Sequence, residues 1–140
     1  MAQEPGYLFM CSGKTFGECM RRSLLGTSGS EMRVMESVIG EETPLVLLHF
    51  TKRVLYGPFY AGTPPQLNAY PDAWEGMATR QRGSPSKGSP YPAQVRIERR
   101  GRVRSWALPE GMMLKAGQLS AGQTREIMSS LTKTAFASEA

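Results

Sequence analysis

The stretch PLVLLHFTKRVLYGPFYA, residues 44–61, decides the fold. Its first half, Leu45–Phe50, is apolar apart from His49, and this density is typical of a strand that is buried on both faces. Three polar residues follow, and the apolar pattern resumes over Val54–Ala61 with aromatic side chains. Two β-rich runs joined by a few polar residues predict a hairpin. Pro58 has no N–H to donate within a sheet, so we expect it at an edge or at a bulge.

The residues before the hairpin predict a strand followed by a helix. Gly6–Ser12 is a short apolar and aromatic run, as expected of a strand. Thr15 and Glu18 have the spacing of a capping box, and we expect the helix that begins here to run over Phe16–Leu25 and to stop at Gly26. The other predicted elements are a short helix at Glu31–Ile39, strands at Ala93–Glu98 and Val103–Leu108, and a helix that begins at a second capping box, Ser120 with Gln123, and ends near Lys133.

The connection after the hairpin is unusually long. It extends over Gly62–Pro90 and is rich in glycine, proline and serine, and loops of this length are either functional or disordered. We expect Gly62–Gly76 to be an ordered excursion held by Tyr70 and Trp74, and residues 77–90 to form a flexible loop. The whole chain, residues 1–140, is expected to be a single domain, because its length suffices for one core.

The composition indicates a protein without membrane contact. No apolar run approaches the roughly 18 residues that a membrane span needs, and the first six residues lack the features of a signal peptide. We therefore expect a cytoplasmic or nuclear protein. In that setting Cys11 and Cys19 are expected to be reduced, buried thiols, since two cysteines at this spacing do not form a zinc site.

Positive charge is concentrated in one segment of the chain. The formal net charge is +5, but the stretch Arg80–Arg104 holds eight basic residues and only Glu98 as an acid, which is a local charge of +7. A regional excess of this kind makes an electrostatic patch. We predict that the strands at Ala93–Glu98 and Val103–Leu108 form a pair whose surface follows a phosphate backbone while an aromatic ring stacks on a base. The alternative is a solvated arginine face without a partner. The residues proposed for this surface are Arg96, Arg99, Arg100, Arg102, Arg104 and Trp106, with Arg104 and Trp106 on one face of their strand.

Motifs for catalysis or metal binding are lacking. The run Ser12–Thr15, SGKT, resembles the end of a phosphate loop, but Leu8 occupies the position where that motif needs a glycine. His49 is the only histidine, and no nucleophile elbow accompanies it. We therefore expect no enzyme, no metal and no cofactor.

Four blocks of the sequence, in this order, resemble the plant-type development and cell death (DCD) domain. They are GYLFMCSGKTFGECMRRSLLG (6–26), PLVLLHFTKRVLYGPFYA (44–61), YPAQVRI (91–97) and LSAGQTREIMSSL (119–131). The resemblance spans nearly the whole chain. It implies an α+β fold with a PUA-like mixed β-barrel flanked by a few helices, similar to the YTH and EVE domains. It also implies a non-enzymatic module in development, stress responses or programmed cell death.

The resemblance to YTH domains raises the question of an aromatic pocket for a modified base. In those domains one tryptophan of the pocket comes from the end of the first helix, where this chain has Leu24, Leu25 and Gly26. A second comes from the long loop after the central hairpin, where Trp74 is the match. The residues proposed for an aromatic pocket are therefore Trp74, Tyr56 and Tyr60, and each has a core or loop anchor as its alternative role.

Two functions from different classes remain. The first is a non-catalytic module that binds single-stranded RNA or another polyanion through the basic face. The second is an adaptor that binds protein partners through the apolar hairpin edge and the Gly62–Pro90 loop, without nucleic acid.

Overall fold

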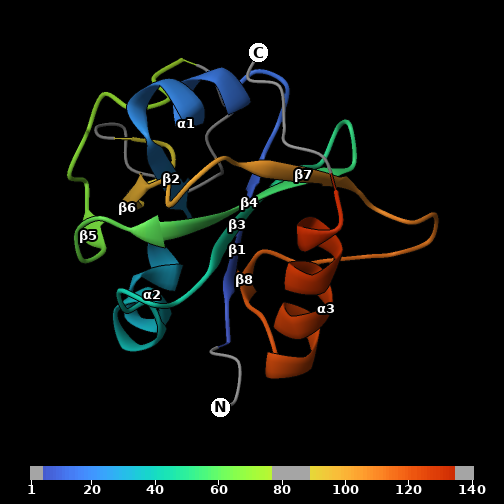
Figure 1. The fold of residues 1–140 in the computed structure, drawn as a ribbon. Helices are drawn as coiled ribbons and strands as arrows, with labels where there is room; N and C mark the ends of the chain where they lie inside the picture. Colours follow the sequence, from blue (N-terminus) through green and yellow to red (C-terminus); the bar gives the residue numbers. More distant parts are fainter. Residues whose placement is uncertain (1–4, 77–88, 135–140) are drawn as a thin grey trace.

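The computed structural model describes residues 5–76 and 89–134 (Figure 1). In that part of the chain eight strands form one mixed sheet, and three α-helices pack against it. From the N-terminus the elements are β1 (Tyr7–Cys11), α1 (Phe16–Arg22), β2 (Leu24–Thr27), a 3-10 turn (Gly29–Glu31), α2 (Met32–Val38), β3 (Leu45–His49), β4 (Val54–Ala61), β5 (Gln66–Leu67), β6 (Ala93–Glu98), β7 (Arg104–Ala107), β8 (Gly117–Gln118) and α3 (Ala121–Thr132).

The strand order is β2-β6-β4-β3-β1-β8, with β5 paired to β6 and β7 paired to β4. β1 runs parallel to β3, and the other strand pairs are antiparallel. β1 and β2 also approach each other, so the sheet curls toward a barrel. The expected α+β fold with a mixed sheet and a few flanking helices is confirmed.

The hairpin of β3 and β4 lies at the centre of this sheet, as predicted. All five residues of β3 are buried, which agrees with its unbroken apolar sequence. The register between the two strands shifts between Leu45, which faces Phe59, and Leu47, which faces Tyr56. Between these pairs Gly57 and Pro58 of β4 lie opposite one residue of β3, which is a bulge. Pro58 is therefore at a bulge, one of the two places expected for it.

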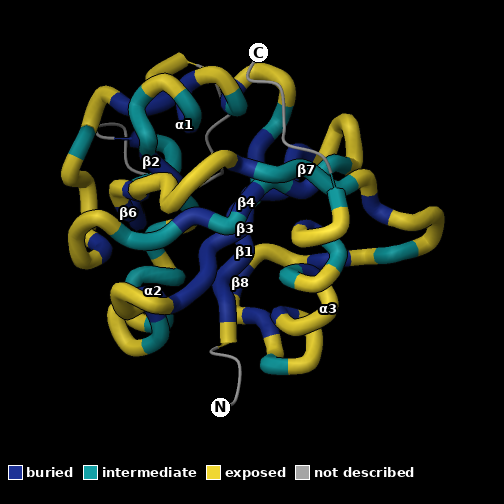
Figure 2. Tube along the Cα trace, in the orientation of Figure 1, coloured by how far each residue is buried: buried dark blue, intermediate teal, exposed yellow. Residues whose placement is uncertain are grey.

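Two hydrophobic cores lie on opposite faces of β1 and β3, whose traces are buried at the centre of Figure 2. Tyr7, Phe9 and Leu47 face the first core, which α1 and α2 cover. Leu8 and Leu48 face the second core, which α3 covers with Ile127 and Leu131. The period of two along each strand therefore sends alternate side chains into different cores.

The first helix is shorter than predicted. α1 ends at Arg22, and Ser23 adopts a left-handed backbone with φ of 51°. The apolar residues after it form β2, which pairs with β6 instead of extending the helix. The expected capping box at the helix start is also wrong, because the Thr15 side chain makes no cap hydrogen bond to α1 and accepts the Ser12 N–H instead. The second capping box, Ser120 with Gln123, is confirmed.

The two arginine-bearing strands do not form a pair with each other. β6 pairs with the end of β4 at Tyr60 and Ala61, whereas β7 pairs with its beginning, Val54–Gly57. The expected strand pair is wrong because β4 is long enough to serve both strands. The excursion over residues 62–76 is ordered as predicted, since Trp74 is buried and the Tyr70 N–H donates to the side chain of Gln94. Most of the predicted flexible loop, residues 77–88, lies outside the described residues.

Candidate nucleic-acid interface

The end of β6 brings Arg96 and Arg99 next to the C-terminus of α1. The Ile97 N–H donates to the carbonyl of Ser23 at 2.9 Å, which holds β6 against the chain that leaves the helix. Arg99 then donates through Nη2 to the carbonyl of Met20 at 3.2 Å, so its guanidinium group lies at the negative end of the helix. Arg96 and Arg99 are exposed, as is Arg102 in the loop that follows.

Arg100 is held by acidic neighbours. Its Nη1 donates to both carboxylate oxygens of Glu42 at 3.1 Å, and its Nε donates to Glu98 at 3.4 Å. The guanidinium carbon also lies 4.2 Å from the centre of the Tyr60 ring, a cation–π contact. The charge of Arg100 is therefore compensated within the molecule.

Arg104 and Trp106 share one face of β7, as predicted, and that face turns toward α3. Arg104 donates through Nη1 to the carbonyl of Thr134, just after the helix. Trp106 is partly buried and packs against the second core. Because its ring packs against this core, only part of it is open to a base.

The two positions that the resemblance relates to a base-binding pocket meet in the structure. A Cβ added to Gly26 would lie 2.7 Å from two ring atoms of Trp74, so the indole ring lies directly on the glycine. Trp74 is 1% exposed, and its ring and the Tyr91 ring pack edge to face with centroids 5.6 Å apart. The indole therefore fills the space beside Gly26. Its Nε1 has no hydrogen-bond partner among the described residues.

The three residues proposed for an aromatic pocket are not brought together around one hollow. Tyr56 packs on the ring of Phe16, with centroids 4.8 Å apart, whereas Tyr60 lies under Arg100. Trp74 packs on the ring of Tyr91. Each ring therefore has the anchoring contacts that were its alternative role.

Sequence reasoning missed a charged cluster at α1 that positions Trp74. Glu18 is buried and forms ion pairs with Arg21 and Arg22. Its carboxylate also accepts a hydrogen bond of 3.0 Å from the backbone N–H of Trp74. Burial by itself would raise the pKa of Glu18, but the Trp74 N–H and the two guanidinium groups bring this pKa below its ordinary value. Arg22 also pairs with Asp72 at 3.0 Å. The helical spacing of Glu18 from the arginines could have indicated the first contacts, but the contacts to the loop are long-range.

His49 has the surroundings of a structural residue. It is 3% exposed, its ring packs on Phe16, and its Nδ1 accepts the Lys52 N–H at 3.3 Å. Burial, and then the charge of Lys52, lower the pKa of the imidazole. Within residues 5–76 and 89–134, no group of three or more His, Cys, Asp or Glu side chains is placed to hold a metal ion. No helix in the same ranges is both long enough and apolar enough to span a membrane.

Comparison with known proteins agrees with the fold and the four sequence blocks. The family model of the development and cell death domain matches residues 5–116. The chain belongs to this family. The DCD domain of this chain is 34% identical over 94 residues to two plant proteins, the DCD domain-containing protein NRP-B of Glycine max and the B2 protein of Daucus carota. The alignment covers 66% of this chain but 26% and 41% of those proteins, so the DCD chain spans less than half of their length.

Solved structures with the same fold include two YTH domains. The Mmi1 YTH domain in complex with RNA superposes with a TM-score of 0.59, over 93% of this chain and 79% of that one. The YTH domain of Zygosaccharomyces rouxii MRB1, in complex with N6-methyladenosine RNA, superposes with a TM-score of 0.58 over 97% of this chain and 93% of that one. The sequence identity is 8% in both cases, so the likeness shows that the DCD domain has the YTH-like fold.

Proposed function

We propose that this DCD domain is a non-catalytic module that binds single-stranded RNA through the exposed residues Arg96, Arg99 and Arg102. The observation that carries this proposal is the gathering of exposed arginines along one short segment, from β6 into the loop before β7. The structural relatives support it, because both YTH domains named above were solved with RNA.

The proposed surface reads the backbone of the RNA and not a single base. Guanidinium groups pair well with phosphate oxygens, and such contacts carry no base sequence. Trp74 fills the space beside Gly26, and Trp106 packs against the second core, so neither ring is set to hold a base in a pocket. We therefore expect binding that tolerates different sequences and weakens steeply with salt.

Arg100 and Arg104 have a supporting role in this proposal. Arg100 is compensated by Glu42 and Glu98, and Arg104 binds the carbonyl of Thr134. These contacts fix the two ends of the loop that carries Arg102. The proposed setting is a cytoplasmic or nuclear one, in development, stress responses or programmed cell death.

The test compares two triple variants that remove the same charge. The first variant changes Arg96, Arg99 and Arg102 to alanine. The second changes three exposed cations elsewhere in the chain to alanine: Arg33, Lys115 and Arg125. Binding to a fluorescent single-stranded RNA is measured over a salt series. If three phosphate contacts are lost, the slope of log affinity against log salt falls by about 2 in the first variant.

The control variant is expected to keep the slope of the original protein. Equal losses in the two variants would show that net charge alone attracts RNA, and no binding by the original protein would refute the proposal. The adaptor function has separate support from an apolar hollow on another side of the domain.

A further inference from the structure

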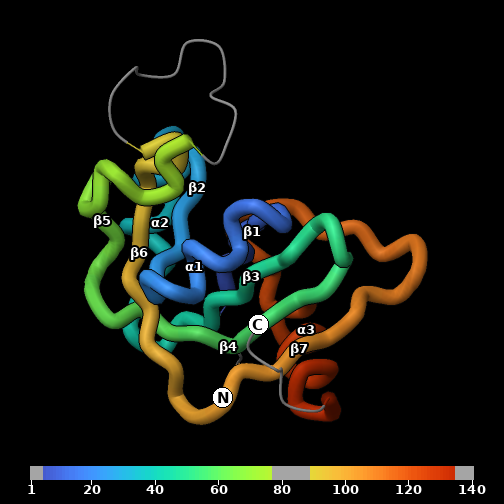
Figure 3. Tube along the Cα trace, turned by 90° about the horizontal axis from the view of Figure 1, so that it is seen from above, coloured from blue at the N-terminus to red at the C-terminus, as the bar shows by residue number. Residues whose placement is uncertain are grey.

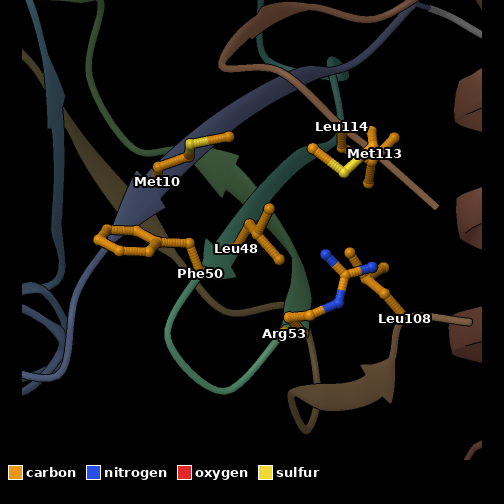
Figure 4. A pocket seen from close by; sticks show the side chains of 7 residues that line it. All are labelled: Met10, Leu48, Phe50, Arg53, Leu108, Met113 and Leu114. Atoms are coloured by element: carbon orange, nitrogen blue, oxygen red, sulfur yellow. The ribbon is translucent and has the colours of Figure 1, made fainter. Parts of the chain in front are cut away.

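A shallow hollow opens directly onto the second core. Its volume is about 120 Å³, and its walls include Met10 of β1, Leu48 of β3, and Leu108 and Leu114 of the loop between β7 and β8 (Figure 4). Leu48, Leu108 and Leu114 are themselves members of that core. A side chain that enters the hollow would therefore contact the same leucines that pack under α3.

The rim of the hollow carries two apolar side chains that face solvent. Three large hydrophobic residues are exposed in the described part of the chain: Phe50 at 53%, Leu67 at 57% and Met113 at 79%. Phe50 and Met113 both line the hollow, whereas Leu67 lies on β5. Single exposed apolar residues are common, but two beside a hollow of leucines make a contiguous patch.

Arg53 supplies a cation at the opposite end of the hollow from Phe50 (Figure 4). Its Nη2 donates to the carbonyls of Pro109 and Met112 at 3.3 and 2.6 Å. Within residues 5–76 and 89–134, its Nε and Nη1 have no hydrogen-bond partner, and no carboxylate pairs with it. Its backbone adopts a φ of 56°, which is uncommon for a residue other than glycine. The two carbonyls are neutral, so no group in the described part of the chain compensates the charge of this guanidinium group.

The charged residues near Arg53 in the sequence of these two loops are mostly positive. Lys52 precedes Arg53 in the turn, Lys115 follows Leu114, and the one acid between residues 109 and 115 is Glu110. A partner for this site therefore needs an apolar group for the hollow and a negative charge for Arg53.

We propose that the hollow binds a peptide segment of a partner protein in which an aliphatic side chain stands next to an aspartate or glutamate. A cavity of about 150 Å³ holds a benzene ring, so the smaller hollow suits a leucine, isoleucine or valine side chain better than an aromatic one. A carboxylate beside that anchor would accept hydrogen bonds from Nε and Nη1 of Arg53, the fork geometry that arginine offers to carboxylates.

The hollow is separate from the arginine surface proposed for RNA. Figures 1 and 3 show the β3–β4 turn and the loop between β7 and β8 projecting on one side of the domain. The segment that carries Arg96, Arg99 and Arg102 lies toward β6 and β2, on the other side of β7. The peptide site therefore does not depend on the RNA-binding proposal.

A selection from a phage-displayed library of random peptides, with the full 140-residue chain as bait, tests this site. The recovered peptides are synthesised with a fluorophore, and their affinity is measured by anisotropy for four proteins. These are the original chain, Met113→Glu, Phe50→Ser and the matched control Leu67→Ser, which changes an equally exposed apolar residue elsewhere. All three positions are exposed, so the variants are expected to fold.

The recovered peptides should share an aliphatic residue within one or two positions of an acid. We expect Met113→Glu to weaken their binding by about tenfold or more, because the new carboxylate removes an apolar contact and repels the acid of the peptide. The loss should be smaller for Phe50→Ser, and none is expected for Leu67→Ser. Replacing the acid of the peptide by its amide should weaken binding and remove most of its salt dependence.

Three results of the selection and of the affinity measurements would overturn the proposal. They are a selection without binders, peptides without the shared pattern, and binding that neither rim variant weakens more than Leu67→Ser does. Displacement of the peptides by single-stranded RNA would also overturn it, because the hollow would then belong to the nucleic-acid surface.

Discussion

Removal of the Glu18 carboxylate should destabilise the domain markedly, although the side chain lies on a short surface helix. Glu18 is 6% exposed and accepts the Trp74 N–H, which is buried. A hydrogen bond to a charged group contributes about 1.5–3 kcal/mol. The ion pairs to Arg21 and Arg22 add less, about 0–1 kcal/mol each, because these side chains are 67% and 30% exposed. We therefore expect Glu18→Ala to cost about 2–4 kcal/mol.

Glu18→Gln separates the charge from the hydrogen bond. The amide oxygen can still accept the Trp74 N–H, so we expect a loss of about 1–2 kcal/mol. Urea unfolding measures both values, and thermal unfolding should show a fall in Tm of about 3–5 °C per kcal/mol for a domain of this size. The control is Glu126→Ala, an exposed glutamate on α3 that should leave stability unchanged.

The advantage of Glu18 over glutamine should depend on pH. The pKa of Glu18 is lower in the folded protein than its ordinary value of 4.5, so the ionised carboxylate stabilises the folded state above that value. This stabilisation is lost as the pH falls through the folded-state pKa. If the difference between the original protein and Glu18→Gln persisted or grew at strongly acidic pH, or if Glu18→Ala cost no more than Glu126→Ala, the reasoning would be refuted.

Three further predictions concern other contacts. Ser120→Ala removes the cap of α3 and should lower the free energy of unfolding, measured in urea, by about 1 kcal/mol. An unchanged free energy of unfolding would show that other contacts hold the helix end. Gly26→Ala forces a Cβ against the ring of Trp74 and should cost about 1–3 kcal/mol, and unchanged stability would show that the indole can move away. Burial raises the pKa of Cys19 to about 11 and also raises that of Cys11, so a thiol reagent near neutral pH should modify both only in urea, and rapid modification of the folded protein would contradict their burial.

Much of the fold could be predicted from local patterns. The apolar density of Leu45–His49 indicated a strand buried on both faces, and the structure places that strand between two cores. The capping box at Ser120 was equally readable, because its two partners lie within one turn of the chain. Such signals depend on neighbouring residues, which is why they hold without knowledge of the remaining structure.

At the end of α1 the local sequence pattern predicted the wrong secondary structure. Leu24 and Leu25 have a spacing that suits a helix, yet they belong to a strand that pairs with β6. The hydrogen bonds of that pairing come from residues about seventy positions later in the chain, and they outweigh a weak local preference. The prediction that β6 and β7 pair with each other was wrong for a similar reason, since β4 offers hydrogen-bond partners to both strands.

The residues of the candidate site could be predicted from the sequence, but their arrangement in space could not. The order of side chains along the sequence revealed the arginine-rich segment, the aromatic residues and the family, because charge and motif are properties of the chain itself. Only the tertiary structure decided that Glu42 compensates Arg100, that Trp74 lies on Gly26, and that Arg53 stands over a hollow of leucines. Each of these contacts joins segments far apart in sequence, and their approach depends on how the sheet curls and which loops pack on it.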